Sequence, residues 1–68
     1  MSSALVRWQL RGVSRRLRAR REELEVIGEQ LLALPDGEDE EAMQRHRLYV
    51  VAEIRQLEQR QDELLDRM

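Results

Sequence analysis

A heptad repeat runs through residues 10–34, LRGVSRRLRARREELEVIGEQLLAL. Its apolar residues recur alternately three and four positions apart, and the spacing is interrupted only at Arg20. They are Leu10, Val13, Leu17, Leu24, Ile27, Leu31 and Leu34, and Val6 extends the pattern toward the N-terminus. This spacing is typical of a helix that buries one narrow seam against a partner. It predicts a helix over about residues 4–34, with a kink or break near Gly12 to Ser14 as the alternative, because glycine weakens a helix interior.

The first repeat ends at Pro35, Asp36 and Gly37, where proline cannot continue a helix and Asp-Gly suits a turn. Beyond a turn at residues 35–38, a second repeat predicts a helix over about residues 39–67, with Asp36 or Asp39 as its N-cap. Its seam residues are Met43, Arg47, Val50, Ile54, Leu57, Gln61, Leu64 and Met68. A short connection makes two long helices antiparallel neighbours. The sequence therefore predicts a single all-α domain over residues 1–68, an antiparallel two-helix hairpin resembling a coiled coil.

The two seams come into register when Leu17 faces Leu57. Three polar residues then interrupt the apolar layers and each faces an aliphatic side chain: Arg20, Arg47 and Gln61. A polar residue in a seam commonly sets the register or the oligomeric state, while its stem packs and its head reaches water. Anion binding between the helices by Arg20 and Arg47 is the alternative interpretation.

Apolar and small residues also occur outside the two seams. They are Leu5, Gly12, Ala19, Val26 and Ala33 in the first helix, and Leu48, Val51 and Leu65 in the second. One hairpin cannot cover both sets, and 68 residues are few for an independent core. These residues predict an oligomerisation surface that forms a homodimeric four-helix bundle or receives a protein partner. Alternatively, the alanines only favour the helix and the aliphatic residues are singly exposed.

Charge is distributed very unevenly along the chain. Seven arginines and no carboxylate occur in residues 1–21, whereas residues 22–68 hold all 14 carboxylates and five arginines. Five residues of the first helix form a candidate site for an anion or a partner: Arg7, Trp8, Arg11, Arg15 and Arg18. Guanidinium groups bind phosphates bidentately, so the stripe is a candidate contact for nucleic acid or an anionic nucleotide. The competing interpretation pairs these arginines, within the hairpin or across a dimer, with carboxylates of the second helix: Glu53, Glu58, Asp62, Glu63 and Asp66.

Several functional classes find no support in the sequence. There is no cysteine, so neither a disulfide nor a thiolate metal site can form, and a cytoplasmic location is predicted. His46 lacks neighbouring metal ligands at the spacing of a helical metal site, and no metal or cofactor is expected. No nucleophile stands near a base, and no glycine-rich loop is present, so catalytic residues and an enzymatic activity are not predicted. Membrane docking through Trp8 is disfavoured because the apolar side is narrow.

These patterns together favour a small non-enzymatic adaptor or regulator that acts through coiled-coil protein contacts and self-association. The alternative is a regulator that binds nucleic acid or an anionic nucleotide through its arginine-rich first helix. A structural assembly subunit is the third hypothesis. The identity of a partner and the biological process are not encoded in these patterns.

Overall fold

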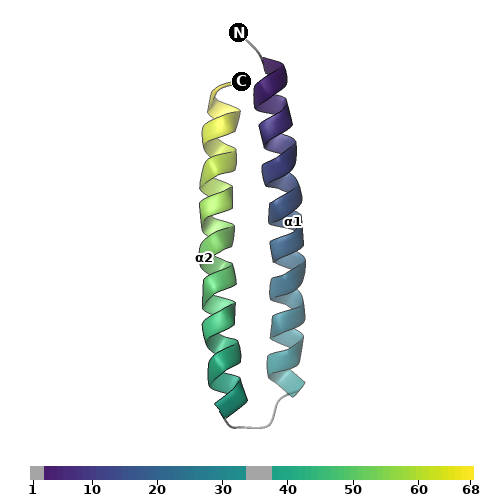
Figure 1. The fold of residues 1–68 in the computed structure, drawn as a ribbon, viewed down its shortest axis with the longest axis vertical. Coiled ribbons are helices and arrows are strands. Elements are labelled where there is room, and N and C mark those ends of the chain that lie inside the picture. Colours follow the sequence, from purple (N-terminus) through teal and green to yellow (C-terminus); the bar gives the residue numbers. More distant parts are fainter. Residues whose placement is uncertain (1–2, 34–37) are drawn as a thin grey trace.

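The computed structural model describes residues 3–33 and 38–68. It contains two helices, α1 (Ser3–Ala33) and α2 (Glu38–Asp66), which pack against each other along their length. They run antiparallel, so the two chain ends lie at the same end of the hairpin (Figure 1). The predicted all-helical hairpin is therefore confirmed. Of the predicted turn at residues 35–38, Glu38 lies in α2, and residues 35–37, including the predicted N-cap Asp36, lie outside the described residues, as does Leu34.

The described helices cover residues 3–33 and 38–66 and overlap the predicted helices at about residues 4–34 and 39–67. α1 continues through Gly12 and Ser14, so the helix does not break there. Asp39 lies inside α2, which begins at Glu38, so Asp39 is not its N-cap. At the other end, the amide nitrogens of Arg67 and Met68 donate to carbonyl oxygens three residues earlier, at 3.2 and 3.1 Å. These bonds tighten the last turn and satisfy two carbonyls that a helix end leaves free.

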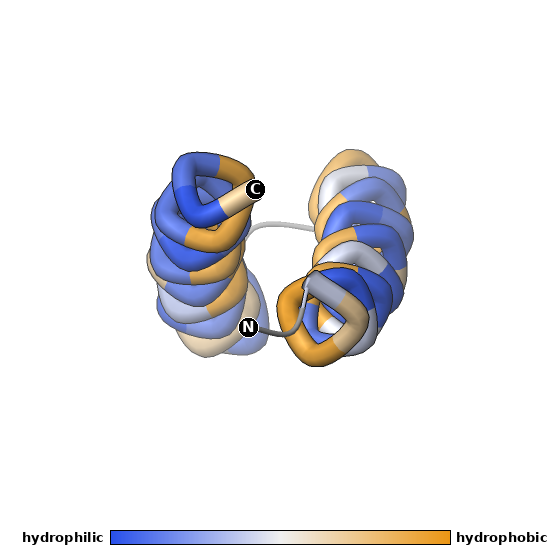
Figure 2. Tube along the Cα trace, turned by 90° about the horizontal axis from the view of Figure 1, so that it is seen from above, coloured by the Kyte–Doolittle hydropathy of each residue, from blue (hydrophilic) through white to orange (hydrophobic). Residues whose placement is uncertain are grey.

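The core is one layer of side chains between the two helices. Its buried residues are Leu17, Ile27, Val50, Ile54 and Leu64. Partly buried side chains flank the main cluster: Val13, Leu24, Leu31, Met43 and Leu57. All ten belong to the two predicted seams, and Figure 2 shows hydrophobic positions on the sides of the helices that face each other. Burial therefore follows the heptad pattern rather than overall hydrophobicity.

Polar contacts between the helices fix the register. Gln61 Nε2 donates to Ser14 Oγ at 3.2 Å, and Arg20 Nε lies 3.0 Å from Glu53 Oε2. Both contacts fit the predicted pairing of Leu17 with Leu57. The polar seam residues differ in burial: Arg20 and Gln61 are half-buried, whereas Arg47 is exposed at the edge of the seam.

The hairpin is a thin rod. Its Cα atoms extend 54 × 14 × 11 Å, and their radius of gyration is 15.7 Å. A compact domain of the same length has a radius of gyration of about 11 Å. Neither helix is both long and apolar enough to cross a membrane, within the residues that the structure describes. Most of each helix surface is consequently exposed in a single chain.

Candidate functional site

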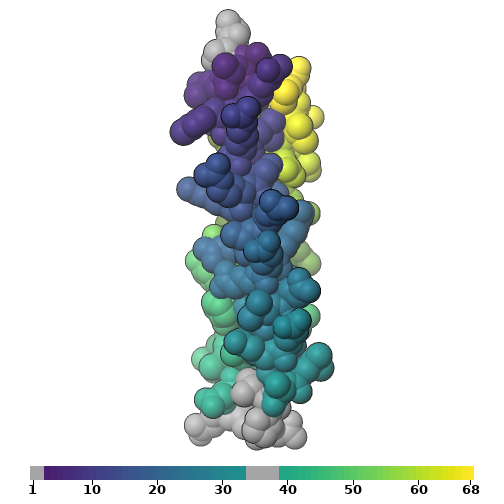
Figure 3. Space-filling view, turned by 90° about the vertical axis from the view of Figure 1, so that its right-hand side faces the viewer, coloured from purple at the N-terminus to yellow at the C-terminus, as the bar shows by residue number. Residues whose placement is uncertain are grey.

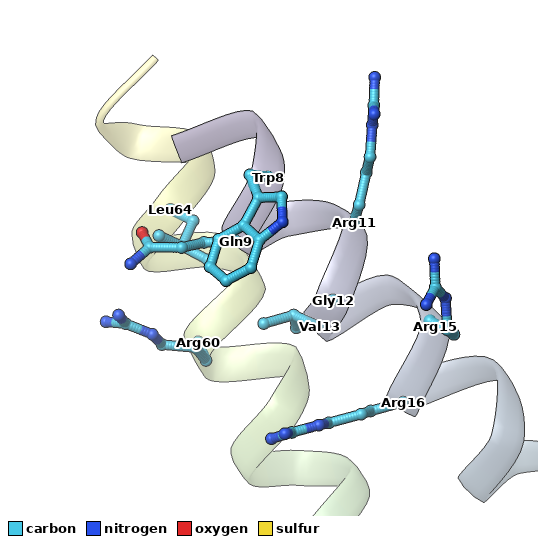
Figure 4. A pocket seen from close by; sticks show the side chains of 9 residues that line it. All are labelled: Trp8, Gln9, Arg11, Gly12, Val13, Arg15, Arg16, Arg60 and Leu64. Atoms are coloured by element: carbon cyan, nitrogen blue, oxygen red, sulfur yellow. The ribbon is translucent and has the colours of Figure 1, made fainter. Parts of the chain in front are cut away.

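A basic groove lies beside Trp8, near the chain ends. It has a volume of about 510 Å³ and no carboxylate among its lining residues, which are Trp8, Gln9, Arg11, Gly12, Val13, Arg15, Arg16, Arg60 and Leu64. Arg11 and Arg15 extend outward, away from α2, whereas Arg16 reaches toward α2 (Figure 4). Trp8 is 70% exposed. The groove thus combines four guanidinium groups with one accessible aromatic ring, and three of its residues, Trp8, Arg11 and Arg15, belong to the predicted anion stripe.

The sequence reasoning missed Arg16 and Arg60. Both flank a seam, Arg16 next to Leu17 and Arg60 next to Gln61. An antiparallel register places such flanking positions on the same side of the hairpin. The heptad pattern and the helix register alone would therefore have been enough to place Arg16 and Arg60 on the same side of the hairpin. Conversely, Arg7 and Arg18 from the predicted stripe do not line the groove.

The arginines of the predicted stripe have no ion-pair partner among the described residues. Glu58 instead lies 3.5 Å from Arg21, and Glu63 lies 3.4 Å from Arg60 on its own helix. Asp62 and Asp66 form no ion pair within residues 38–68 or with α1. The internal pairing considered from the sequence is thus not formed by these side chains.

Folding leaves the charge separated along the rod. Residues 3–21 carry seven arginines, and the antiparallel segment beside them, residues 53–68, carries five carboxylates and three arginines. The half of the hairpin near the chain ends is therefore formally about +5. The other half, described over residues 22–33 and 38–52, holds eight carboxylates and two arginines, or about −6. The uneven distribution of charge along the sequence therefore persists in the folded hairpin, in which one half of the rod is positive and the other half is negative.

The best-connected polar cluster surrounds Arg20. Its Nη1 donates to Glu23 Oε2 at 2.6 Å, and its Nε lies 3.0 Å from Glu53 Oε2. That buried Glu53 oxygen has no hydrogen bond of acceptable angle, so the contact with Arg20 is an ion pair. His46 Nε2 donates to the other Glu23 oxygen at 3.1 Å. These groups join α1 to α2 at the middle of the rod.

Arg20 and Glu23 shift each other's pKa values. The hydrogen bond from Arg20 lowers the pKa of Glu23 below its ordinary 4.5, against an opposing effect of burial. The hydrogen bond to Glu23, together with the charge of Glu53, raises the pKa of Arg20. Arg20 and Glu23 are therefore both charged at neutral pH. The cluster is only partly accessible, and its contact between Arg20 and Glu53 anchors the register of the two helices.

The predicted oligomerisation surface is largely exposed. Leu5, Val26, Leu48 and Leu65 are exposed, as are Gly12, Ala19 and Ala33, and only Val51 is half-buried. Two further large hydrophobic residues that the sequence reasoning missed are exposed, Leu32 at 90% and Tyr49 at 67%. Met68, which was predicted as a seam residue, is 59% exposed because it lies at the end of the rod, beyond the last turn of α2. Within the described residues, no three histidine or acidic side chains are grouped closely enough to hold a metal ion.

No protein-family model, curated protein or solved structure shows significant similarity to this chain.

Proposed function

We propose that this chain is a non-enzymatic adaptor or regulator that acts by self-association and by helix-to-helix protein contacts. The observation that carries this proposal is the amount of exposed surface. The chain has an accessible surface of 5727 Å². A typical monomer of its mass exposes about 4,500 Å². The excess of roughly 1,200 Å² exceeds the ~800 Å² that each partner contributes to a standard protein interface.

The character of the surface supports the same function. Among the residues whose burial the structure describes, five apolar side chains are buried and eight large hydrophobic side chains are exposed at 49% or more. Exposed apolar surface beyond scattered single residues generally marks an interaction site. A second copy, giving a four-helix bundle, would cover part of it. The cytoplasmic location remains a prediction that accompanies this function.

Sedimentation equilibrium of the purified chain at micromolar concentration tests self-association. We expect at least twice the chain mass of 8.1 kDa at low salt. A folded species of 8.1 kDa at every concentration and salt tested would contradict self-association. An adaptor function would then require that the single chain binds a different protein.

Binding of a polyanion is a second candidate function, favoured by the groove beside Trp8. Its four arginines are not balanced by any carboxylate in the lining, and the exposed indole offers a surface on which a base can stack. Single-stranded nucleic acid supplies both phosphates and unpaired bases. Binding of this kind weakens steeply as salt rises, because counterions are released.

Trp8 reports on this second function directly because it is the only tryptophan. Titration with a single-stranded oligonucleotide should quench its fluorescence if the groove binds nucleic acid. Arg16→Gln with Arg60→Gln should abolish the quenching while the circular dichroism of the hairpin is retained. Unchanged Trp8 fluorescence at low salt would exclude nucleic acid from the groove.

A further inference from the structure

α1 carries a second helical stripe on its outward side, which we name the outer strip. Its members follow each other at alternating spacings of four and three: Ala4, Trp8, Arg11, Arg15, Arg18, Glu22, Glu25, Glu29 and Leu32. All nine are exposed. Figure 3 shows the side of the molecule on which α1 lies in front of α2 along the rod. The outer strip thus has the periodicity of a coiled-coil seam but no helix against it in the single chain.

The composition of the outer strip changes sign at its middle. Trp8 and Leu32 lie near its ends and are the two most exposed large hydrophobic residues in the described part of the chain, at 70% and 90%. Between them, three arginines are followed by three carboxylates: Arg11, Arg15, Arg18, Glu22, Glu25 and Glu29. None of these six forms an ion pair within residues 3–33 and 38–68.

The outer strip is complementary to itself when one copy is reversed. A two-fold axis beside Arg20 places Trp8 of one copy at the same height as Leu32 of the other. At the same heights come Arg11 with Glu29, Arg15 with Glu25, and Arg18 with Glu22. Each pair occurs twice by symmetry, because such an interface uses the same patch on both copies.

We infer that a second copy of this chain docks on the outer strip, with the two α1 helices antiparallel. This inference rests on the proposed self-association and specifies its partner, its surface and its orientation. A parallel arrangement would set arginines against arginines and carboxylates against carboxylates. The separated charges of the rod favour the same antiparallel orientation, because the half with a net charge of about +5 then lies beside the half with about −6.

The dimensions of the contact fit a dimer of moderate stability. From Trp8 to Leu32 the strip is about 36 Å long at 1.5 Å per residue. Gly12 and Ala19 flank it, and a Cβ added at Gly12 would meet no atom within 4 Å, so a second helix can approach closely there. Exposed ion pairs contribute little individually and are screened by salt. The interface is therefore salt-sensitive, and Trp8 and Leu32, which are exposed in the single chain, would become buried at its two ends.

A second copy explains the strip better than a polyanion does. A polyanion would engage the three arginines but would be repelled by Glu22, Glu25 and Glu29. It would also leave Leu32 uncovered. The reversed copy matches the whole strip, including the carboxylates that form no ion pair with the described residues of their own chain.

A charge swap in one chain tests the inference. In Arg15→Glu, the new carboxylate would face Glu25 of the partner subunit twice in the dimer, and in Glu25→Arg two arginines would face each other twice. Each single variant should raise the Kd for dimerisation about tenfold or more at low salt. The double variant Arg15→Glu with Glu25→Arg should return the Kd to within about threefold of the parent, because attraction is restored between copies.

Both substitutions should leave the hairpin folded. The residues are ten positions apart and do not contact each other within α1, since only neighbours three or four apart do so. Moreover, Arg15→Glu places a carboxylate beside Arg11 and Arg18 on the same helix, which stabilises the helix while weakening the dimer. Arg55→Glu on the exposed surface of α2 is the matched control and should leave the Kd unchanged.

The possible outcomes separate the inference from the proposed function. A parent dimer whose Kd is unaffected by either single substitution would overturn docking on the outer strip but keep self-association. Weakened single variants that are not rescued in the double variant would overturn the antiparallel orientation. A parent that stays monomeric at low salt would overturn self-association itself. Rescue in the double variant, with Arg55→Glu unchanged, supports the antiparallel dimer.

Discussion

Leu17→Ala should destabilise the hairpin more than almost any other single truncation. Leu17 is 1% exposed and lies in the main core cluster with Ile27, Val50 and Ile54. The substitution removes three buried carbons, which corresponds to about 2.4 kcal/mol at ~0.8 kcal/mol per carbon. The residual cavity adds to this, so a loss of about 3 kcal/mol is expected.

That loss is large compared with the total stability. A chain of 68 residues has a free energy of unfolding of about 3–10 kcal/mol at ordinary values per residue. Urea unfolding followed by circular dichroism, at one fixed protein concentration, should therefore show a much lower midpoint or no folded baseline. Leu48→Ala makes the same chemical change at a side chain that is 67% exposed, and should alter the free energy of unfolding by less than about 0.5 kcal/mol. Equal midpoints for Leu17→Ala and the parent would refute the assigned seam and register.

Three further substitutions probe separate parts of the structure. The heptad pattern alone predicts that Arg20→Leu stabilises the seam. The structure predicts that it destabilises the hairpin, because the buried Glu53 oxygen loses its ion-pair partner, and that the double variant Arg20→Leu with Glu53→Leu recovers stability. Thermal melts of both variants distinguish these predictions. Glu23→Gln should lower the stability of the hairpin above pH 4.5. The pKa of Glu23 is lower in the folded state than in the unfolded state, so the ionised carboxylate stabilises the fold at any pH above the unfolded-state pKa. The difference from the parent should vanish as the pH falls through the folded pKa of Glu23, as measured by urea midpoints at neutral and acidic pH. Gly28→Ala should stabilise α1 by up to about 1 kcal/mol, since no atom lies within 4 Å of the added Cβ; a lower midpoint would indicate a contact that the hairpin alone lacks.

The seam could be predicted from the sequence because burial along a thin hairpin depends almost entirely on periodicity. Leu17 and Val50 are buried for that reason, while Leu32 and Leu48 are exposed although they are equally apolar. The Pro-Asp-Gly segment, together with the two repeats, was enough to predict the antiparallel pairing of the helices.

The charge pairs could not be predicted in the same way. A long arginine side chain can reach several carboxylates that lie at similar distances from it. Which carboxylate it pairs with depends on the side-chain rotamers and on the positions of the two residues along the rod. Arg20 reaches across to Glu53, and Arg21 to Glu58, whereas Arg11 and Arg15 extend away from α2. The sequence also places Arg20 opposite Ile54 without revealing that Glu53 is close enough to form an ion pair.

The outer strip illustrates a different limit. Its periodicity is present in the sequence, but the same helix also carries the apolar repeat of the seam, which is the stronger signal. Only the packed hairpin shows which side of α1 remains uncovered, and that its arginines and carboxylates both lack partners. The outer strip is therefore identified as a candidate interface by its exposure in the structure, which the sequence does not show.

Distances between spin labels in the dimer test the antiparallel docking of α1 most directly. Because the chain has no cysteine, Arg7→Cys and Arg21→Cys each introduce one label site on α1 beside the outer strip. With a two-fold axis beside Arg20, the labels at residue 7 are about 39 Å apart along the rod and those at residue 21 about 3 Å apart, at 1.5 Å per residue. Double electron–electron resonance should accordingly give a much longer distance for the residue 7 pair than for the residue 21 pair. Equal short distances at both positions would mean a parallel dimer and would contradict the account.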